Sequence, residues 1–323
     1  MDKTDTVNKW YDIFLEALSE KYPQKVQLVQ ALMDLLSIER ESVYRRLRKD
    51  VAFHILEIVK ISSEWNISLD RITGLKMQQV PFMMQKVDYL NSSEQELSYL
   101  QNIIYSINEL KDTSDTEFMY ICNKLPRQLY AGFDALYKFH LFKWKYQYSN
   151  ETSTPFAQIE ISENNRILTA AYYQAIKEVP SSNFILDRML FEYIMHDIRY
   201  FQSIRLITRE DIVLIKNDLH NLLDYLHEVA AKGCYPETRN KVTLYVSQLN
   251  IDTNYSYVYT QDVKICFVQV FDKYEIYSFD LEMVENFKTW MQRKKKMSTQ
   301  ISEVDEKSRF EFFDKQRQLV DEL

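Results

Sequence analysis

Glycine is scarce in this sequence, which has only Gly74, Gly132 and Gly233 among its 323 residues. An average protein contains about 7% glycine. Isolated glycines cannot form the GxGxxG or GxxxxGKS/T loops that cradle phosphates, so the common nucleotide-binding motifs are excluded. Because glycine is also a poor helix former, its scarcity favours helices. We therefore expect a mainly helical protein without a cofactor.

Cysteines and long apolar runs are also few. Cys122, Cys234 and Cys266 are odd in number and widely spaced, which indicates buried thiols in a reducing compartment rather than a disulfide framework. No run approaches the ~18 apolar residues that a membrane span needs. The N-terminus lacks the basic start and apolar core of a signal peptide. We expect a soluble cytoplasmic protein.

Catalytic and metal-binding motifs are missing as well. No nucleophile and base can be paired, so we expect no enzymatic activity. His220 and His227 are seven residues apart, and His196 precedes Asp197, but no cysteine or carboxylate cluster completes a tetrahedral metal site around them. We expect no bound metal.

Apolar side chains are plentiful, and charge is unevenly distributed. Hydrophobic residues make up 46% of the chain and aromatic residues 14%, which argues against extensive disorder. The formal net charge is −7, yet residues 1–76 contain twelve Lys/Arg and twelve Asp/Glu. Positions 40–49 alone carry five cations and one anion. A basic stripe on a neutral domain suits docking on phosphates, whereas the acidic remainder should stay away from DNA.

Four helices are expected in this neutral part. The first ends before Pro23, and the others cover about 25–36, 39–49 and 52–65. A tight turn near Ser37 would join the second and third helices at an angle. The apolar residues expected to pack these two helices are Leu32, Leu36, Ile38, Val43 and Leu47. The candidate core of the fourth helix is Phe53, Ile55, Leu56, Ile58, Val59, Ile61 and Trp65.

The other face of the third helix carries long cationic and hydrogen-bonding side chains. These are Arg40, Tyr44, Arg45, Arg48 and Lys49. Such side chains suit phosphates and the acceptor-rich edge of guanine. This face therefore indicates DNA binding.

The helix order, the string SIERESVYRRLR at 37–48, the apolar helix after it and ISLDRI at 67–72 resemble a known family. It is the phage-repressor (Cro/C1, lambda-repressor-like) helix-turn-helix family, and the resemblance is strongest to its BetR-like bacterial transcriptional regulators. The resemblance covers residues 20–75 and implies a double-stranded DNA-binding domain at 1–76. The contacts it implies are Arg40, Glu41, Tyr44 and Arg45 to base edges, Arg48 and Lys49 to phosphates, and Gln27 and Gln30 to the DNA backbone.

Three positions depart from the family pattern. Met33 stands where an alanine is usual, and Ser37 replaces the usual turn glycine. Arg46 occupies the position three residues after Val43, where an apolar residue is expected, with Leu47 one step later. The register of the recognition helix is therefore open by one residue. Met33, Ser37 and the acidic remainder also leave an alternative, a protein-interaction module with a repressor-like fold that no longer binds DNA.

The rest of the chain suggests two further regions. Residues 77–150 follow a boundary near 76–80 and are expected to be a helical, linking region with one or two short strands. It contains a helix at about 93–111, a strand at 117–125 and an aromatic helix at 127–147. This last helix either packs centrally or lines a ligand cavity. A linker-like segment at 149–155 precedes the third region, 151–323.

The third region begins with helices at about 161–179, 183–207 and 208–232. Four strands at 241–250, 255–260, 263–271 and 274–279 then indicate an antiparallel meander, before helices at 281–296 and 303–322. The expected fold class is mainly α with a small antiparallel β part: a lambda-repressor-like helical domain and a larger α+β C-terminal region. We expect the latter to form a homodimer and to sense an unidentified small-molecule or protein effector.

Overall fold

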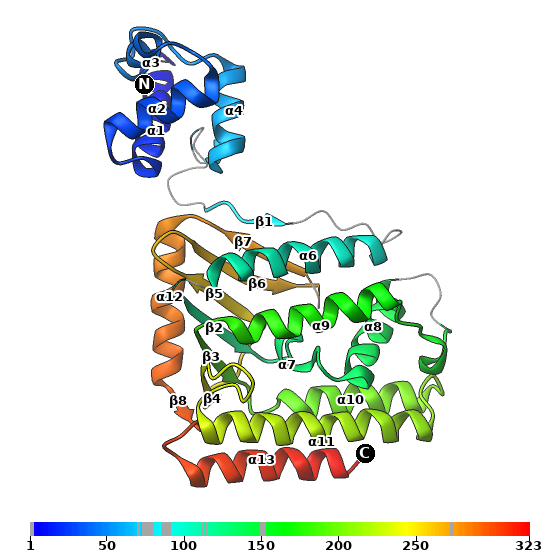
Figure 1. Cartoon of the computed structure of the whole chain (residues 1–323). Coiled ribbons are helices and arrows are strands. Elements are labelled where there is room, and N and C mark those ends of the chain that lie inside the picture. The colour runs from blue at the N-terminus through cyan, green and yellow to red at the C-terminus, as the bar shows by residue number, and fades with distance from the viewer. Residues whose placement is uncertain are drawn as a thin grey trace. The chain divides into compact units, whose positions relative to one another are not determined.

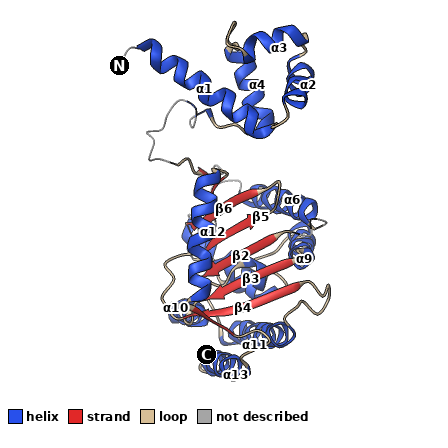
Figure 2. Ribbon diagram, turned by 90° about the vertical axis from the view of Figure 1, so that its left-hand side faces the viewer, coloured by secondary structure: helices blue, strands red, loops and turns tan. Residues whose placement is uncertain are grey.

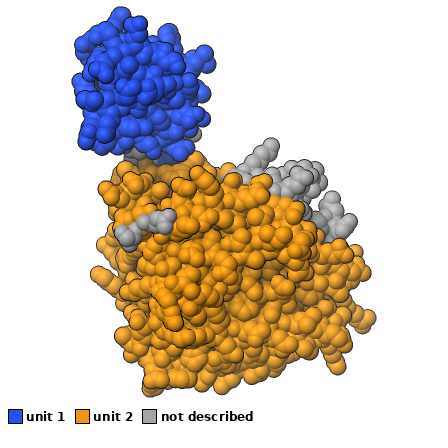
Figure 3. Space-filling view, viewed as in Figure 1, with its two compact units in different colours: residues 1–81 blue, residues 82–323 orange. Residues whose placement is uncertain are grey.

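The structure is a computed structural model that describes residues 3–69, 72, 80–84, 92–111, 113, 115–148, 153–271 and 274–323. It divides the chain into two compact units, residues 1–81 and 82–323 (Figure 3). Except for Val80, the boundary expected near 76–80 lies outside the described residues. The first four residues of the expected linker at 149–155 also lie outside them.

The first unit is helical throughout its described secondary structure. It contains the four expected helices, α1 (Lys3–Lys21), α2 (Lys25–Leu36), α3 (Arg40–Leu47) and α4 (Ile55–Trp65) (Figure 1). Apolar side chains from all four helices meet in one core. The buried members of this core are Phe14, Leu18, Leu28, Val29, Leu32, Val43, Phe53, Ile61, Trp65 and Ile72.

The fourth helix differs from expectation in which of its apolar residues are buried. Ile61 and Trp65 are buried as expected, but Ile55, Leu56 and Val59 are 69%, 78% and 47% exposed. A helix advances about 100° per residue, so a single core can cover only the stripe shared by positions three and four apart. The prediction that these three residues are core was therefore wrong.

The second unit is built on an eight-stranded mixed sheet with the order β1-β7-β6-β5-β2-β3-β4-β8 in its described part. The strands are β1 (Met83–Met84), β2 (Glu117–Cys122), β3 (Ser181–Leu186), β4 (Lys241–Ser247), β5 (Tyr255–Tyr259), β6 (Lys264–Val270), β7 (Tyr274–Ser278) and β8 (Ser298–Gln300). Strands β2, β3 and β4 are parallel, whereas β5, β6 and β7 form an antiparallel meander beside β2.

This sheet corrects the expected small antiparallel part. The four strands expected between 241 and 279 are all present, but β4 does not pair with β5. It pairs in parallel with β3 and antiparallel with β8. Strand β3 was not predicted: its residues 183–186 fall in the segment predicted as a helix at 183–207, and residues 182–186 are buried without a break. A central parallel strand is buried on both faces and so loses the period-2 pattern that would distinguish it from a buried helix.

Helices cover the two faces of the sheet unequally (Figure 2). One face packs against α12 (Leu281–Lys296), which contributes Val284, Phe287 and Met291 to a core with β2, β3 and β5. The larger core lies on the opposite face. The helices that contribute to it are α6 (Ser92–Leu110), α7 (Arg127–Tyr130), α8 (Asp134–Tyr148), α9 (Glu163–Glu178), α10 (Leu190–Ser203), α11 (Arg209–Lys232) and α13 (Glu306–Asp321), and a 3₁₀ turn spans Phe156–Gln158.

The aromatic segment expected as one helix at 127–147 is two helices, α7 and α8, separated at residues 131–133. Gly132 lies in this break, where a side chain would overlap the ring of Tyr173 on α9. The close approach explains why glycine stands there. Leu136, Phe139 and Phe142 of α8 are buried in the larger core, as the packing interpretation predicts.

Candidate nucleic-acid interface

The candidate interface is formed by α2, α3 and the three residues between them. Ser37 ends α2 in the left-handed conformation, with φ 55° and ψ 45°, and is exposed. Ile38 returns to pack against the core, and Arg40 then begins α3. Met33 is half-buried against the same core. The turn expected near Ser37 is therefore present without a glycine.

The inward face of α3 resolves the one-residue uncertainty in register. Val43 is fully buried, Tyr44 and Leu47 are half-buried, and Arg46 also turns inward. Only 12% of the Arg46 side chain is exposed. An arginine therefore occupies the position where the family resemblance implies an apolar residue.

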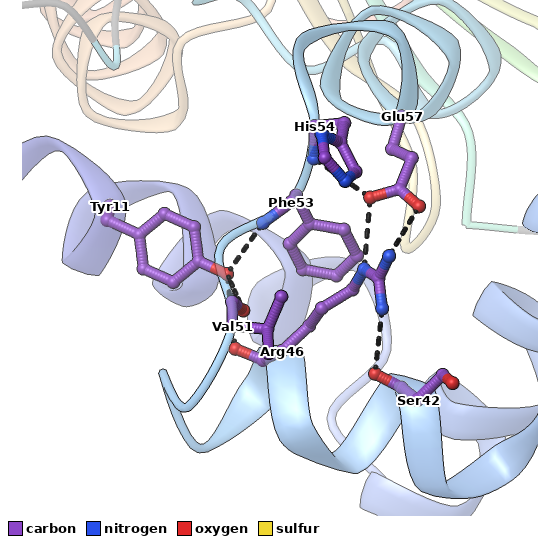
Figure 4. A network of polar contacts seen from close by, with 7 residues as sticks. All are labelled: Tyr11, Ser42, Arg46, Val51, Phe53, His54 and Glu57. Carbon is purple, nitrogen blue, oxygen red and sulfur yellow. Dashed lines mark hydrogen bonds and ion pairs between the residues drawn. The ribbon is translucent and has the colours of Figure 1, made fainter.

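Arg46 is held by a bidentate ion pair to α4 (Figure 4). Its Nη2 lies 2.8 Å from Glu57 Oε1, and its Nε donates to Glu57 Oε2 at 3.0 Å. Its Nη1 donates to the carbonyl of Ser42 at 3.1 Å. The guanidinium also lies over the Phe53 ring, 5.8 Å from its centroid. Each polar group that Arg46 buries thus has a partner, as a buried charge requires.

Tyr11 joins α1 to the same network (Figure 4). Its hydroxyl donates to the carbonyl of Arg46 at 3.1 Å and accepts from the N–H of Phe53 at 3.2 Å. Glu57 also accepts from the N–H of His54 at 2.9 Å. Burial alone would raise the pKa of Glu57, but the hydrogen bonds from Arg46 and His54 outweigh it and hold the pKa below its ordinary value. The C-terminal end of α3 is therefore fixed to both α1 and α4.

The outward face of α3 carries the predicted base-contacting charges. Arg40, Glu41 and Arg45 are all exposed. Within the described part of the chain, neither Arg40 nor Arg45 has an ion-pair partner. Arg45, two residues after Val43, lies on the opposite side of the helix, and Arg40 is exposed as the first residue of α3.

Acidic neighbours engage the two predicted phosphate-contacting cations. Arg48 Nη2 lies 2.8 Å from Glu41 Oε1, and its Nε lies 3.3 Å from Asp50 Oδ2. Lys49, which has a left-handed backbone with φ 70°, forms an ion pair with Asp12 of α1. These side chains are about half exposed, so the pairs are weak and exchange readily.

The two predicted contact residues of α2 are open to solvent. Gln27 and Gln30 are exposed, and Gln30 Nε2 donates to Asp34 Oδ1 at 2.9 Å. The ammonium of Lys25 lies over the Tyr44 ring, 5.8 Å from its centroid. Lys25 was not among the predicted contacts, although a cation in the first turn of α2, next to the glutamines, was a signal for it.

Two of the histidines that the sequence offered as possible metal ligands have hydrogen-bond or packing partners within the protein. His220 Nε2 lies 3.1 Å from Asp321 Oδ1, and His227 stacks on Phe313. In the segments that the structure describes, no three His, Cys, Asp or Glu side chains are grouped to hold a metal ion. Cys122 and Cys266 are buried, as expected, but Cys234 is only half-buried. None of the described helices is both long and apolar enough to cross a membrane.

Comparisons of the chain with protein-family models, with curated proteins and with solved structures found no match.

Proposed function

We propose that this chain is a sequence-specific transcriptional regulator that binds double-stranded DNA with α3 in the major groove. The observation that carries the proposal is the division of cations on α3. Arg46 is buried in an ion pair with Glu57, whereas Arg40 and Arg45 are exposed and unpaired among the described residues. The buried cation of α3 is already paired, so it need not move when the helix binds. The exposed cations can therefore contact an anionic groove without a rearrangement of the core.

The residue types on the outer face suit base readout. Arg40 and Arg45 can each donate two hydrogen bonds to O6 and N7 of guanine, and Glu41 can accept from the amino group of cytosine. Tyr44 is half-buried, and the ammonium of Lys25 lies over one face of its ring. Arg48 and Lys49 are proposed to exchange their carboxylate partners for phosphates, which costs little at exposed pairs.

We propose that the protein acts as a homodimer, because a short recognition helix gains useful affinity when two copies read half-sites about 34 Å apart. The second unit, with its large sheet, is the part we assign to dimerisation and to sensing an unidentified effector. Its acidic charge supports a role away from the phosphates.

A specific observation also favours the second candidate, a protein-interaction module that does not bind DNA. Arg48 and Lys49 already have acidic partners, and α4 exposes a group of apolar side chains. Under this alternative, the charged side chains of α3 are simply hydrated at the protein surface and bind no DNA.

Selection of bound fragments from random duplex DNA by the full chain separates the two candidates. We expect recovery of a palindrome whose half-sites contain guanine. Arg40→Ala/Arg45→Ala should abolish the enrichment, whereas Lys60→Ala, which removes an exposed cation from α4, should retain it. Random recovered sequences from the native chain would overturn the proposal and favour the interaction module.

A further inference from the structure

His227 of α11 faces the terminal helix α13, which lies alongside α11 (Figure 1). Its imidazole ring stacks on Phe313 of α13, with the ring centroids 5.0 Å apart, and meets the edge of Phe310 at 5.1 Å. Its Nδ1 lies 3.2 Å from Nη2 of Arg317, also on α13. His227 is half-buried. It is therefore part of the contact through which α13 packs on α11.

The hydrogen bond to Arg317 fixes the protonation state of His227 in this contact. A guanidinium has only donors, so Nδ1 of His227 must accept the hydrogen bond through its lone pair. The imidazole is therefore neutral while α13 is packed. A proton on Nδ1 would remove the acceptor and place a second cation beside the guanidinium.

Charged groups from both helices act on a proton at His227. They are Asp224 of α11 and Arg309, Asp314 and Arg317 of α13. The arginines are the more buried pair, because Arg309 is 7% exposed and only 26% of the Arg317 side chain is exposed. The side chains of Asp224 and Asp314 are 69% and 62% exposed, so water screens their attraction more strongly. Burial and the two arginines therefore hold the pKa of His227 below its ordinary value of 6.5.

The second histidine of α11 has the opposite surroundings. His220 Nε2 lies 3.1 Å from Oδ1 of Asp321, near the end of α13. Lys216 Nζ donates to the carbonyl of Asp321 at 2.8 Å. A proton on His220 would face a carboxylate, which attracts it, so it would not oppose the packing of α13. Of these two histidines, His227 is the one whose protonation opposes the contact.

The helix α13 covers part of the larger core of the second unit. Phe312, Phe313 and Val320 belong to that core, and Phe313 and Val320 are fully buried. Release of α13 would therefore expose apolar surface of the second unit to water. A change of charge at His227 thus has a structural consequence larger than the loss of one hydrogen bond.

We propose that the contact between α11 and α13 is an acid-sensitive switch, in which neutral His227 keeps α13 packed and protonated His227 loosens it. The switch lies within the second unit and rests on no contact with DNA, so it stands apart from the proposed function. With α13 released, His227 is in water and binds a proton at its ordinary pKa of 6.5. With α13 packed, it binds the proton only at lower pH. The packing is therefore complete well above pH 6.5 and weakens as the pH falls from 6.5 towards the lower pKa.

Hydrogen–deuterium exchange of the full chain, followed by mass spectrometry, tests the switch. After correction for the intrinsic exchange rate, opening of α13 should rise by up to about tenfold between about pH 7.5 and about pH 5.5, because one proton is taken up. The helix α12 contains no histidine and should show no such rise. In His227→Gln, whose amide oxygen can still accept from Arg317 but takes up no proton, the rise should disappear. The matched control on the same helix, His220→Gln, should keep it.

An equal rise in the native chain and in His227→Gln, or no rise in the native chain, would overturn the switch. If His227→Gln loosens α13 at both pH values, Arg317→Gln decides, because it removes the cation closest to the ring. Acid should then open α13 by a smaller factor than in the native chain. A factor as large as the native one would overturn the proposal.

Titration of the imidazole provides a second measurement in the native chain. In protein with ¹³C-labelled histidine, the resonance missing from His227→Gln identifies His227. Its midpoint should lie below 6.5 and move up in Arg317→Gln, because the repelling charge is gone. A native midpoint at or above 6.5, or no movement in Arg317→Gln, would contradict the switch.

Discussion

Arg46 is the residue on which the geometry of α3 depends. A guanidinium can be buried only where its donors find acceptors, and Glu57 and the Ser42 carbonyl supply them. In the sequence, Arg46 differs from Arg45 and Arg48 only in standing three residues after Val43, where an apolar residue is expected. The partner that separates them, Glu57, is eleven residues away on another helix. Its role could therefore not be predicted from the local pattern.

Removal of Glu57 should be more harmful than removal of the whole ion pair. Glu57→Ala leaves Arg46 buried and unpaired, and we expect a loss of about 3 kcal/mol in unfolding free energy of the first unit. Arg46→Met/Glu57→Met should stay within about 1 kcal/mol of the native chain. Urea unfolding followed by the ¹⁹F signal of fluorotryptophan at Trp65, which is buried in this unit, measures both. A double variant as unstable as Glu57→Ala would contradict the pairing.

The lowered pKa of Glu57 predicts a dependence of stability on pH. The ordinary pKa is 4.5, and the folded value lies below it. The stabilisation is therefore complete above about 4.5 and is lost as the pH falls through the folded value. The difference in unfolding free energy between the native chain and Glu57→Gln should be constant from about pH 7 to 5 and shrink below 4.5. A constant difference down to about pH 3 would contradict the assignment.

At the scale of elements, the turn between α2 and α3 shows that two helices can be joined at a left-handed residue other than glycine. Ser37 and Asn66 both end helices in the left-handed region, with φ 55° and 54°. Asparagine adopts this conformation readily, whereas serine does so at a cost. The turn was predictable from the apolar residues that flank it, since Leu32 and Val43 must both reach the core.

Ser37→Gly should therefore stabilise the first unit. Glycine relieves the left-handed strain but loses more chain entropy on folding, so we expect a net gain of about 0.5 kcal/mol. The matched control is Ser42→Gly inside α3, where glycine should cost about 0.5 kcal/mol relative to serine. Urea midpoints of the Trp65 signal compare the two variants. Equal destabilisation by both would show that the turn is not strained.

Elements with a clear period or cap were predictable, and elements buried on all sides were not. The helix at 281–296 was expected from Asp280, whose side chain indeed accepts from the N–H of Met283. Strand β3 was hidden because Phe184, Ile185 and Leu186 are all buried. For α4, apolar residues occupy two sides of one helix, and nothing local indicates which side meets the core.

At the scale of the whole molecule, sheet order was beyond the reach of local patterns. Strand β2 lies between β5 and β3, so it pairs with segments about 140 and 65 residues later in the chain. The expected location of most strands was right, but their pairing depends on these distant partners. The candidate interface was easier to predict from the sequence than the sheet order. Its predicted residues are confined to positions 27–49, on or next to two neighbouring helices.

The chain also separates its charges between the two units. Residues 1–76 are neutral and contain the exposed cations of α3, whereas residues 77–323 hold the net charge of −7. An acidic second unit disfavours nonspecific coating of DNA by the rest of the molecule. Affinity for DNA must then come from a few cations of the first unit. The dependence of that affinity on salt concentration directly measures how many phosphates they neutralise.

The salt dependence of duplex binding by the full chain tests the central claim most directly. Each phosphate neutralised contributes about −0.9 to the slope of log affinity against log salt concentration. We expect a clearly negative slope for the native chain. Its magnitude should fall by about two per bound copy in Arg48→Ala/Lys49→Ala, which removes the two proposed phosphate contacts, and stay unchanged in Lys60→Ala. A native slope near zero, or equal slopes for the native chain and the double variant, would contradict binding through α3.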